Sequence, residues 1–216
     1  MKMTPDNCTS GTTSGKITDA VSGDNVTGVY LEARRGFNRP WRPVKATDTT
    51  DSSGDYSFSS MKRGWYTVQT SKSGYIDGKF YVRSCGDVGN QDFAIAKVLA
   101  STETMQIVLT WQPTNPVTGD DLDAHIQVPD NNSINSLHLH WALNTYGRDQ
   151  GDDYITYSTT DNVSLDRDEQ EPPGTETITV IEVRSGFTYS YSVHDFTNRS
   201  NSYSGSKLAN SGAFVT

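Results

Sequence analysis

The sequence predicts an all-β protein made of two tandem antiparallel β-sandwich domains. Short runs of alternating apolar and polar residues recur about every 8–12 positions and are divided by turn residues, a pattern typical of sandwiches. No window of about 12 residues carries a helical period of 3.6. At 216 residues the chain has room for two domains of about 100 residues, which we place at 1–99 and 104–216.

Seven strands are expected in each half, because short alternating runs are followed by turn residues such as Gly and Asn. Residues 98–103 form a short linker without Pro or Gly. The expected strands of the first half are 15–19, 29–34, 44–49, 55–59, 64–70, 79–84 and 91–97. Those of the second half are 105–111, 123–128, 137–143, 153–158, 176–183, 188–195 and 213–216.

Four residues of the first half are expected in its core. Tyr56 and Phe58 share one face of a strand, as do Tyr66 and Val68, because side chains two apart point the same way. Their rings can fill the space between two sheets.

Residues 13–97 resemble the carboxypeptidase regulatory-like domain. The resemblance rests on the opening at 14–29 (SGKITDAVSGDNVTGV), the motif DSSGDYSF at 51–58, and RGWYTV at 63–68 followed by SGY at 73–75. It implies a seven-stranded, prealbumin-like sandwich without catalytic residues, which serves as a spacer, stalk or adhesion unit beside another domain.

Residues 104–216 resemble the YfaP-like, DUF2135-type β-rich domain of secreted and surface proteins. The motifs are IVLTW at 107–111, DLDAH at 121–125, LDRD at 165–168 and GTETIT at 174–179. Thr175 replaces the usual proline, and an insertion lies near 144–152. Such domains usually continue past residue 215, so a trimmed domain or an open strand position is expected here.

The candidate metal ligands are acidic residues of the second half. Asp121 and Asp123 alternate with apolar residues, so both carboxylates should lie on one strand face, where they repel each other. Asp166 and Asp168 form a second pair with strand spacing. With Glu176 or Asp120 the set could supply the oxygens that Ca²⁺ requires, although the spacing is not that of an EF-hand. Solvated surface charge, or ion pairs with Arg148 or Arg167, are the alternatives.

The four histidines, His125, His138, His140 and His194, all lie in the second half. His138 and His140 should point to one face of a strand, an arrangement that zinc often uses. No HExxH or CxxC pattern accompanies them, so we interpret them as buried histidines hydrogen-bonded to the main chain.

The basic, aromatic segment at 34–45 is not expected to lie in the hydrophobic core. It is expected to form an exposed hairpin tip that contacts another protein, because Trp and Arg dominate interface hot spots. A sugar-stacking site and an ordinary solvated loop are the alternatives. The contact residues are Arg34, Arg35, Phe37, Arg39, Trp41 and Arg42.

Charge is divided unevenly between the halves. Residues 1–100 hold 13 Lys/Arg and 10 Asp/Glu, a net charge of +3, whereas residues 101–216 hold 5 and 16, a net charge of −11. An acidic chain is not suited to nucleic acid. The asymmetry does suit calcium in the second half, or a head-to-tail contact between neighbouring copies.

Several features favour an extracellular or cell-surface location. Cys8 and Cys85 can form a single disulfide in an oxidising compartment. No run of about 18 apolar residues exists, so no membrane insertion is expected. The first eight residues do not form a secretory signal, and we interpret the chain as mature or as a fragment. N-glycosylation sequons begin at Asn7, Asn25, Asn131, Asn162 and Asn198.

The sequence therefore predicts a non-enzymatic structural subunit of a surface filament, stalk or adhesive layer that self-associates into a homopolymer. No nucleophile elbow, P-loop or dinucleotide fingerprint is present in the sequence. One alternative is a monomeric carbohydrate-binding adhesin that uses Trp41, Trp65 or Trp141. The other is a metal-dependent hydrolase that uses the histidines and aspartates.

Overall fold

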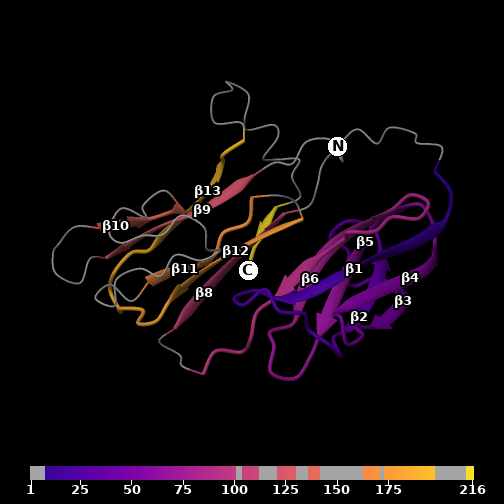
Figure 1. The fold of residues 1–216 in the computed structure, drawn as a ribbon, viewed down its shortest axis with the longest axis horizontal. Helices are drawn as coiled ribbons and strands as arrows, with labels where there is room; N and C mark the ends of the chain where they lie inside the picture. Colours follow the sequence, from indigo (N-terminus) through magenta and orange to yellow (C-terminus); the bar gives the residue numbers. More distant parts are fainter. Residues whose placement is uncertain are drawn as a thin grey trace. The chain divides into compact units, whose positions relative to one another are not determined.

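The structure is a computed structural model that describes residues 8–100, 104–111, 121–129, 136–141, 163–170, 173–197 and 213–216. The described residues form strands, turns and loops without an α-helix, which confirms the all-β class. The chain divides into two compact units (Figure 1). Unit 1 comprises Met1–Asp19 and Gly23–Val98, and unit 2 comprises Ala20–Ser22 and Leu99–Thr216. No helix in the described part is long and apolar enough to span a membrane.

Unit 1 contains two sheets, with strand orders β4-β1-β7 and β3-β2-β5-β6. One pair departs from the antiparallel prediction, because β1 and β7 run parallel, with Ile17 opposite Phe93. The other strand pairs of unit 1 are antiparallel. The strands are β1 (Gly11–Asp19), β2 (Tyr30–Arg35), β3 (Val44–Thr49), β4 (Asp55–Met61), β5 (Gly64–Ser71), β6 (Gly78–Ser84) and β7 (Phe93–Ile95).

The core of unit 1 is aromatic, as the alternation predicts. Tyr56 and Phe58 on β4 and Tyr66 and Val68 on β5 are all buried. Phe80 stacks on Phe93 at 4.5 Å between ring centroids, and the Tyr56 ring packs at 5.3 Å from that of Phe58. The Tyr56 hydroxyl donates a hydrogen bond to the Gln91 carbonyl, so its polar end is satisfied within the core. The predicted core positions of the four residues are confirmed.

A disulfide joins Cys8 to Cys85, which confirms the predicted bridge. The two residues are separated by 77 positions and their Cα atoms lie 4.9 Å apart. The loop that the bond closes contains β1 to β6 in full. The bond therefore ties the start of unit 1 to the segment that leads into its last strand.

Unit 2 also contains two sheets, with strand orders β10-β9-β13 and β11-β12-β8-β14. All the pairs are antiparallel. The final strand pairs with β8, so Val215 lies opposite Leu109. The strands are β8 (Met105–Trp111), β9 (Leu122–Pro129), β10 (Ser136–Leu139), β11 (Val163–Arg167), β12 (Gly174–Val180), β13 (Ser190–Asp195) and β14 (Phe214–Val215).

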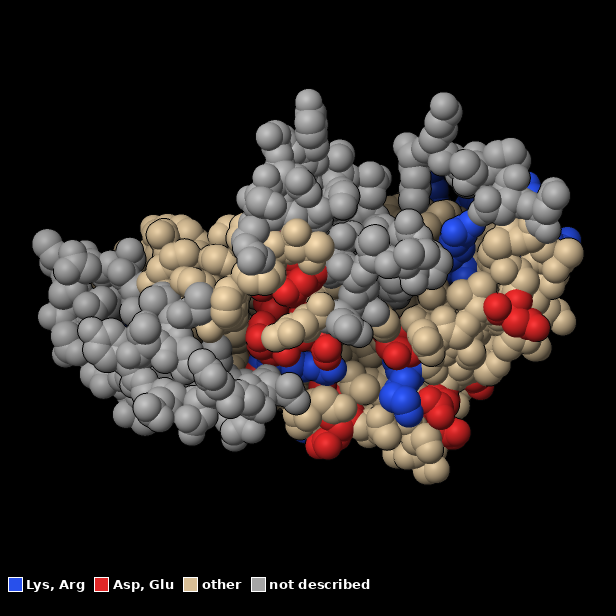
Figure 2. All heavy atoms as spheres, turned by 45° about the horizontal axis from the view of Figure 1, so that its top comes forward, with Lys and Arg blue, Asp and Glu red and all other residues tan. Residues whose placement is uncertain are grey.

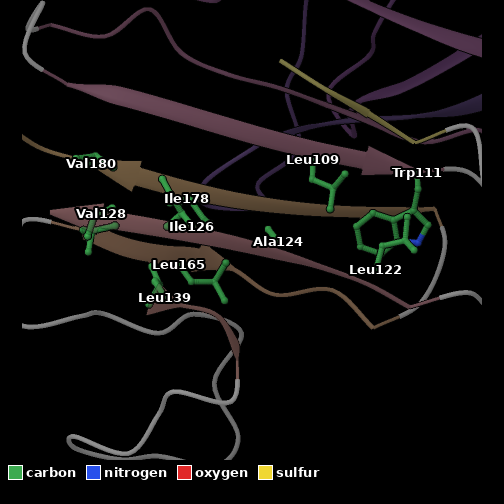
Figure 3. Close-up of a cluster of buried hydrophobic side chains, with 11 residues drawn as sticks. Leu109, Trp111, Leu122, Ala124, Ile126, Val128, Leu139, Leu165, Ile178 and Val180 are labelled. Carbon is green, nitrogen blue, oxygen red and sulfur yellow. The ribbon is translucent and has the colours of Figure 1, made fainter. Parts of the chain in front are cut away.

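The core of unit 2 is formed by inward-facing residues of both sheets (Figure 3). On β9 the even-numbered residues enter the core, which leaves Asp123, His125 and Gln127 on the opposite strand face. This alternation positions the polar residues discussed below. The buried cluster consists of Leu109, Trp111, Leu122, Ala124, Ile126, Val128, Leu139, Val163, Leu165, Ile178 and Val180.

Gly174 is essential to this core, because it lies opposite Trp111 in the β12–β8 ladder. A Cβ atom at residue 174 would lie 2.0 Å from Cζ2 of the buried Trp111 indole. We expect Gly174→Ala to lower the free energy of unfolding of unit 2 by about 3 kcal/mol, the upper end of typical overpacking costs. Chemical denaturation followed by tryptophan fluorescence measures the loss.

The matched control for this substitution is Gly89→Ala. The nearest atom to a Cβ at residue 89 is Ser14 Oγ at 3.8 Å, an ordinary contact. That variant should unfold within about 0.5 kcal/mol of the parent. Equal stability of both variants would show that Trp111 can move aside.

Most predicted strands match in place, with ends that differ by a few residues. The ranges 44–49 and 105–111 agree fully, whereas β1 begins four residues earlier than expected and 91–97 shortens to β7. Strand β11 was not predicted as a separate run. The expected strand 153–158 lies outside the described residues.

Candidate functional site

Acidic side chains from three segments of unit 2 converge on one point. Carboxylate oxygens of Asp121, Asp123 and Glu176 lie within 4.8 Å of one another. Asp168 joins them, because its carboxyl group lies close enough to Glu176 to raise the pKa of that residue. Two of the four, Asp123 and Glu176, are buried. In the space-filling view, Asp and Glu side chains gather in a patch on the visible face (Figure 2). We refer to Asp121, Asp123, Asp168 and Glu176 as the carboxylate cluster.

Glu176 is the most buried member of the carboxylate cluster, with 1% of its surface exposed. It projects from β12, and its Oε2 atom accepts a short hydrogen bond from the backbone N–H of Ala124 on β9. Its Oε1 atom is buried and receives no hydrogen bond from an N–H or hydroxyl donor among the described residues. Burial, followed by the contact with Asp168, raises the pKa of Glu176 well above its ordinary value.

A hydroxyl group lies close to this buried carboxylate. The Tyr191 hydroxyl is buried and has no hydrogen-bond partner among the described residues. Burial, followed by the charge of Glu176, raises the pKa of Tyr191. The site therefore combines excess negative charge with a buried oxygen that lacks a donor, an arrangement that a hard cation would satisfy.

Asp166 lies apart from the carboxylate cluster, so the prediction that it shares a face with Asp168 is wrong. A β-bulge between Leu165 and Arg167 adds one residue to β11, and everything beyond it changes face. The Asp166 carboxylate instead accepts hydrogen bonds from the hydroxyls of Ser164 and Thr179. Burial raises the pKa of Asp166, and these two bonds oppose that shift.

Ion pairing with Arg167 is one alternative for the acidic residues, but Arg167 pairs with Glu169, which is not a candidate ligand. Arg167 lies 3.1 Å from Glu169 and is therefore engaged outside the carboxylate cluster. Asp120 and Arg148 lie outside the described residues.

The four histidines gather on the strand face of β9 that points away from the core. His125 Nδ1 lies 2.9 Å from His138 Nε2, and the His125 ring stacks on His140 at 4.8 Å. The ring of His194 lies 5.6 Å from that of His125. Because His138 and His194 are exposed, the interpretation of all four as buried residues is wrong. We refer to these four residues as the histidine cluster.

Burial and the neighbouring imidazoles disfavour the charged forms of His125 and His140. Burial, followed by the neighbouring His140, His138 and His194, lowers the pKa of His125 to about 4. Burial also lowers the pKa of His140. A neutral imidazole has a free lone pair, which a metal ion requires.

In the hairpin between β2 and β3, some side chains are exposed and others contact the rest of unit 1. Trp41 is 69% exposed, and the guanidinium of Arg39 lies 5.2 Å from its ring centroid. Phe37 instead stacks on Tyr81 at 4.1 Å, and Arg34 forms an ion pair with Glu32. Two further predicted contact residues, Arg35 and Arg42, are engaged with main-chain carbonyls, those of Arg63 and Arg35 respectively. Arg42 stays exposed despite its bond to the Arg35 carbonyl, and we refer to Arg39, Trp41 and Arg42 as the exposed tip.

The other predicted sites are placed as follows. Asn25 is exposed, as a glycosylated residue must be. Asn7, Asn131, Asn162 and Asn198 lie outside the described residues. Trp141, named for the sugar-binding alternative, packs edge-on against Phe196 at 5.0 Å.

Comparison with protein families places one domain in this chain. The family model of the carboxypeptidase regulatory-like domain matches residues 12–110. This stretch is therefore similar to a carboxypeptidase regulatory-like domain. The matched region begins at the second residue of β1, covers the other strands of unit 1 and extends into β8. The resemblance of residues 104–216 to the YfaP-like domain stays a prediction. No curated protein matches the chain.

Solved structures that resemble the chain have low similarity scores. The 3-chlorocatechol 1,2-dioxygenase of Rhodococcus opacus matches at 12% identity and a TM-score of 0.32, over 45% of this chain and 64% of its own. The full-length major pilin SpaD of Corynebacterium diphtheriae matches at 13% identity and a TM-score of 0.33, over 86% of this chain and 56% of its own. The minor pilin GBS52 of Streptococcus agalactiae matches at 18% identity and a TM-score of 0.31, over 44% and 48%. The matches thus span less than two thirds of each of these proteins.

Proposed function

We propose that the chain is an extracellular structural subunit of a surface filament, stalk or adhesive layer, in which copies associate head-to-tail. The observation that carries this proposal is the exposed tip of Arg39, Trp41 and Arg42. An exposed Trp beside guanidinium groups has the composition of an interface hot spot. The tip belongs to the half with a net charge of +3, and the half at 101–216 has a net charge of −11. Opposite charges on the two halves favour contact between the first half of one copy and the second half of the next.

Calcium is the second part of this proposal. The carboxylate cluster supplies only oxygen ligands, the type that Ca²⁺ prefers. Glu176 Oε1 supports this assignment, because it is buried and lacks a donor among the described residues. A bound cation would supply the missing partner and offset the repulsion between the carboxylates. Calcium would thereby stabilise unit 2, the acidic partner of the contact.

The disulfide and the family of the first domain agree with a structural role. The Cys8–Cys85 bond suits an oxidising, extracellular compartment. A β-sandwich closed by a disulfide holds its shape without a ligand, as a spacer in a stalk must.

The proposal is tested by electron microscopy and light scattering of the full chain, with calcium and with a chelator. We expect filaments or large particles in calcium and smaller particles after chelation. Assembly should also weaken as salt rises from about 50 to 500 mM, since screening shortens the reach of the charges. A monodisperse particle of 23.8 kDa under every condition would contradict self-association.

A charge-reversal variant tests the tip itself. Arg39→Glu/Arg42→Glu should reduce assembly by at least tenfold at equal concentration, because it places negative charge against an acidic surface. The matched control is Lys62→Glu/Arg83→Glu, which makes the same change in net charge at exposed residues that are not part of the tip. Equal losses in both variants would show that net charge alone matters and that the tip is not the contact.

The exposure of Trp41 also favours a second candidate function, carbohydrate binding. An accessible indole can stack on a sugar ring, and Arg39 can donate hydrogen bonds to its hydroxyls. A glycan array separates the two functions. Saturable binding to one glycan class that Trp41→Ala abolishes would support the adhesin, whereas a structural subunit should show none.

A further inference from the structure

The histidine cluster borders the carboxylate cluster at Asp123, which belongs to both candidate sites, but its imidazoles have their own structural basis. Residues of β9 alternate, so Asp123 and His125 point to the same face, away from the core. Strand pairing then brings in the other histidines, because His194 on β13 lies opposite Asp123 and His138 on β10 lies opposite Gln127. Three adjacent strands therefore place imidazoles around His125.

The distances around Asp123, His125 and His194 are those of a nearly assembled metal site. One ligand atom from each of the three residues lies within 4.8 Å of the other two. Bonds of about 2.1 Å to a tetrahedral ion put ligand atoms roughly 3.4 Å apart. Small side-chain rotations suffice to close that difference, and His194 is exposed enough to make them.

The hydrogen bonds of His125 indicate how it would be held. Its Nδ1 atom lies 2.9 Å from His138 Nε2. Its Nε2 atom is buried and has no hydrogen-bond partner among the described residues. Metal-binding histidines commonly use one ring nitrogen for the ion and the other for an orienting hydrogen bond. His125 has such an arrangement, with His138 as the orienting residue.

We propose that Asp123, His125 and His194 bind a divalent transition-metal ion such as Zn²⁺ or Cu²⁺, and that His138 positions His125. Two imidazoles and one carboxylate select these ions over Ca²⁺, which prefers oxygen ligands. Three protein ligands leave a fourth position open for water or a small anion.

The surroundings of His194 resemble the apolar shell of a metal site. Phe196 lies edge-on to His194 at 6.4 Å and packs against Trp141 at 5.0 Å. Aromatic side chains on one side limit solvent access and strengthen the metal–ligand bonds. Trp141 is also close enough to report on a bound ion, since Cu²⁺ quenches nearby indole fluorescence.

The test uses the full chain without an affinity tag, dialysed against EDTA and then titrated with zinc chloride or copper chloride. Calorimetry should give one equivalent bound per chain. His125→Gln and His194→Gln should each weaken zinc binding by at least 100-fold. His138→Gln should weaken it about tenfold, as the loss of an orienting residue does. Gln127→Ala, an exposed change on the same face, should leave the affinity within threefold.

Electron paramagnetic resonance of the copper-loaded chain distinguishes this site from the carboxylate cluster. Two imidazole ligands give nitrogen hyperfine structure that carboxylates cannot produce. His194→Gln should remove one nitrogen coupling, whereas His138→Gln should retain both. Oxygen-only spectra, or zinc affinity that survives the double variant His125→Gln/His194→Gln within threefold, would overturn the proposal. So would the absence of zinc uptake by the parent chain.

Discussion

Calcium should raise the free energy of unfolding of unit 2 by about 4 kcal/mol at a concentration one thousand times its dissociation constant. Glu176→Gln should abolish most of this response. The amide oxygen can still accept the Ala124 N–H bond, and the amide N–H groups can donate to Asp168. The variant therefore removes one negative charge and the buried oxygen that lacks a donor. Differential scanning calorimetry with calcium and with a chelator measures both effects.

The difference in stability between Glu176→Gln and the parent should change sign between the buffer with calcium and the buffer with a chelator. Burial beside Asp168 disfavours the ionised form of Glu176, so without calcium the glutamine variant should be at least as stable as the parent at pH 7. With calcium the parent should be the more stable protein. A mutation that merely damaged packing would lower stability in both buffers.

Asp166→Asn is the matched control. The sequence suggests Asp166 as a ligand, but its carboxylate is bound by Ser164 and Thr179 and lies outside the carboxylate cluster. This variant should keep the calcium response, whereas Asp168→Asn should lose it. A parent chain that does not respond to calcium would refute the calcium site, and so would an equal loss in both aspartate variants.

Removing the disulfide should lower the free energy of unfolding of unit 1 by about 4 kcal/mol. The bond closes a loop with a sequence separation of 77, and such a loop loses considerable conformational entropy in the unfolded chain. In a domain of about 100 residues this corresponds to a fall in melting temperature of roughly 15–25 °C. Calorimetry of Cys8→Ser/Cys85→Ser measures the shift.

The unfolding of unit 2 provides the internal reference for this experiment, because its described residues contain no cysteine. Reduction of the parent chain should reproduce the loss, and reduction should have no effect on the serine variant. If the melting temperature of unit 1 changes by less than about 3 °C, the bond contributes little to its stability.

The alternation of apolar and polar residues in the sequence predicted which side chains share a strand face. Tyr56 and Phe58 are buried because side chains two apart on a strand share a face, and that spacing is visible in the sequence. The same rule placed Asp121 and Asp123 together. Cys8 and Cys85 could be paired because they are the only two cysteines.

Features that depend on strand pairing could not be predicted. The bulge in β11 separates Asp166 from Asp168, and nothing in the run SLDRD distinguishes a bulged strand from a regular one. The histidine cluster requires β9 to lie between β10 and β13, whereas the sequence shows only the His138 and His140 spacing. The parallel pairing of β1 and β7 likewise joins residues far apart in the chain.

The disulfide also determines how unit 1 would respond to tension. A pull between the start of the chain and the linker to unit 2 enters at Cys8 and passes directly to Cys85 through the covalent bond. Strands β1 to β6 therefore lie in a loop that carries no load. At roughly 3.4 Å per residue, the 77-residue separation corresponds to about 260 Å of chain. Force cannot extend this part of the chain while the disulfide is intact. A stalk built from such units would keep its length under force in an oxidising environment and become extensible when reduced.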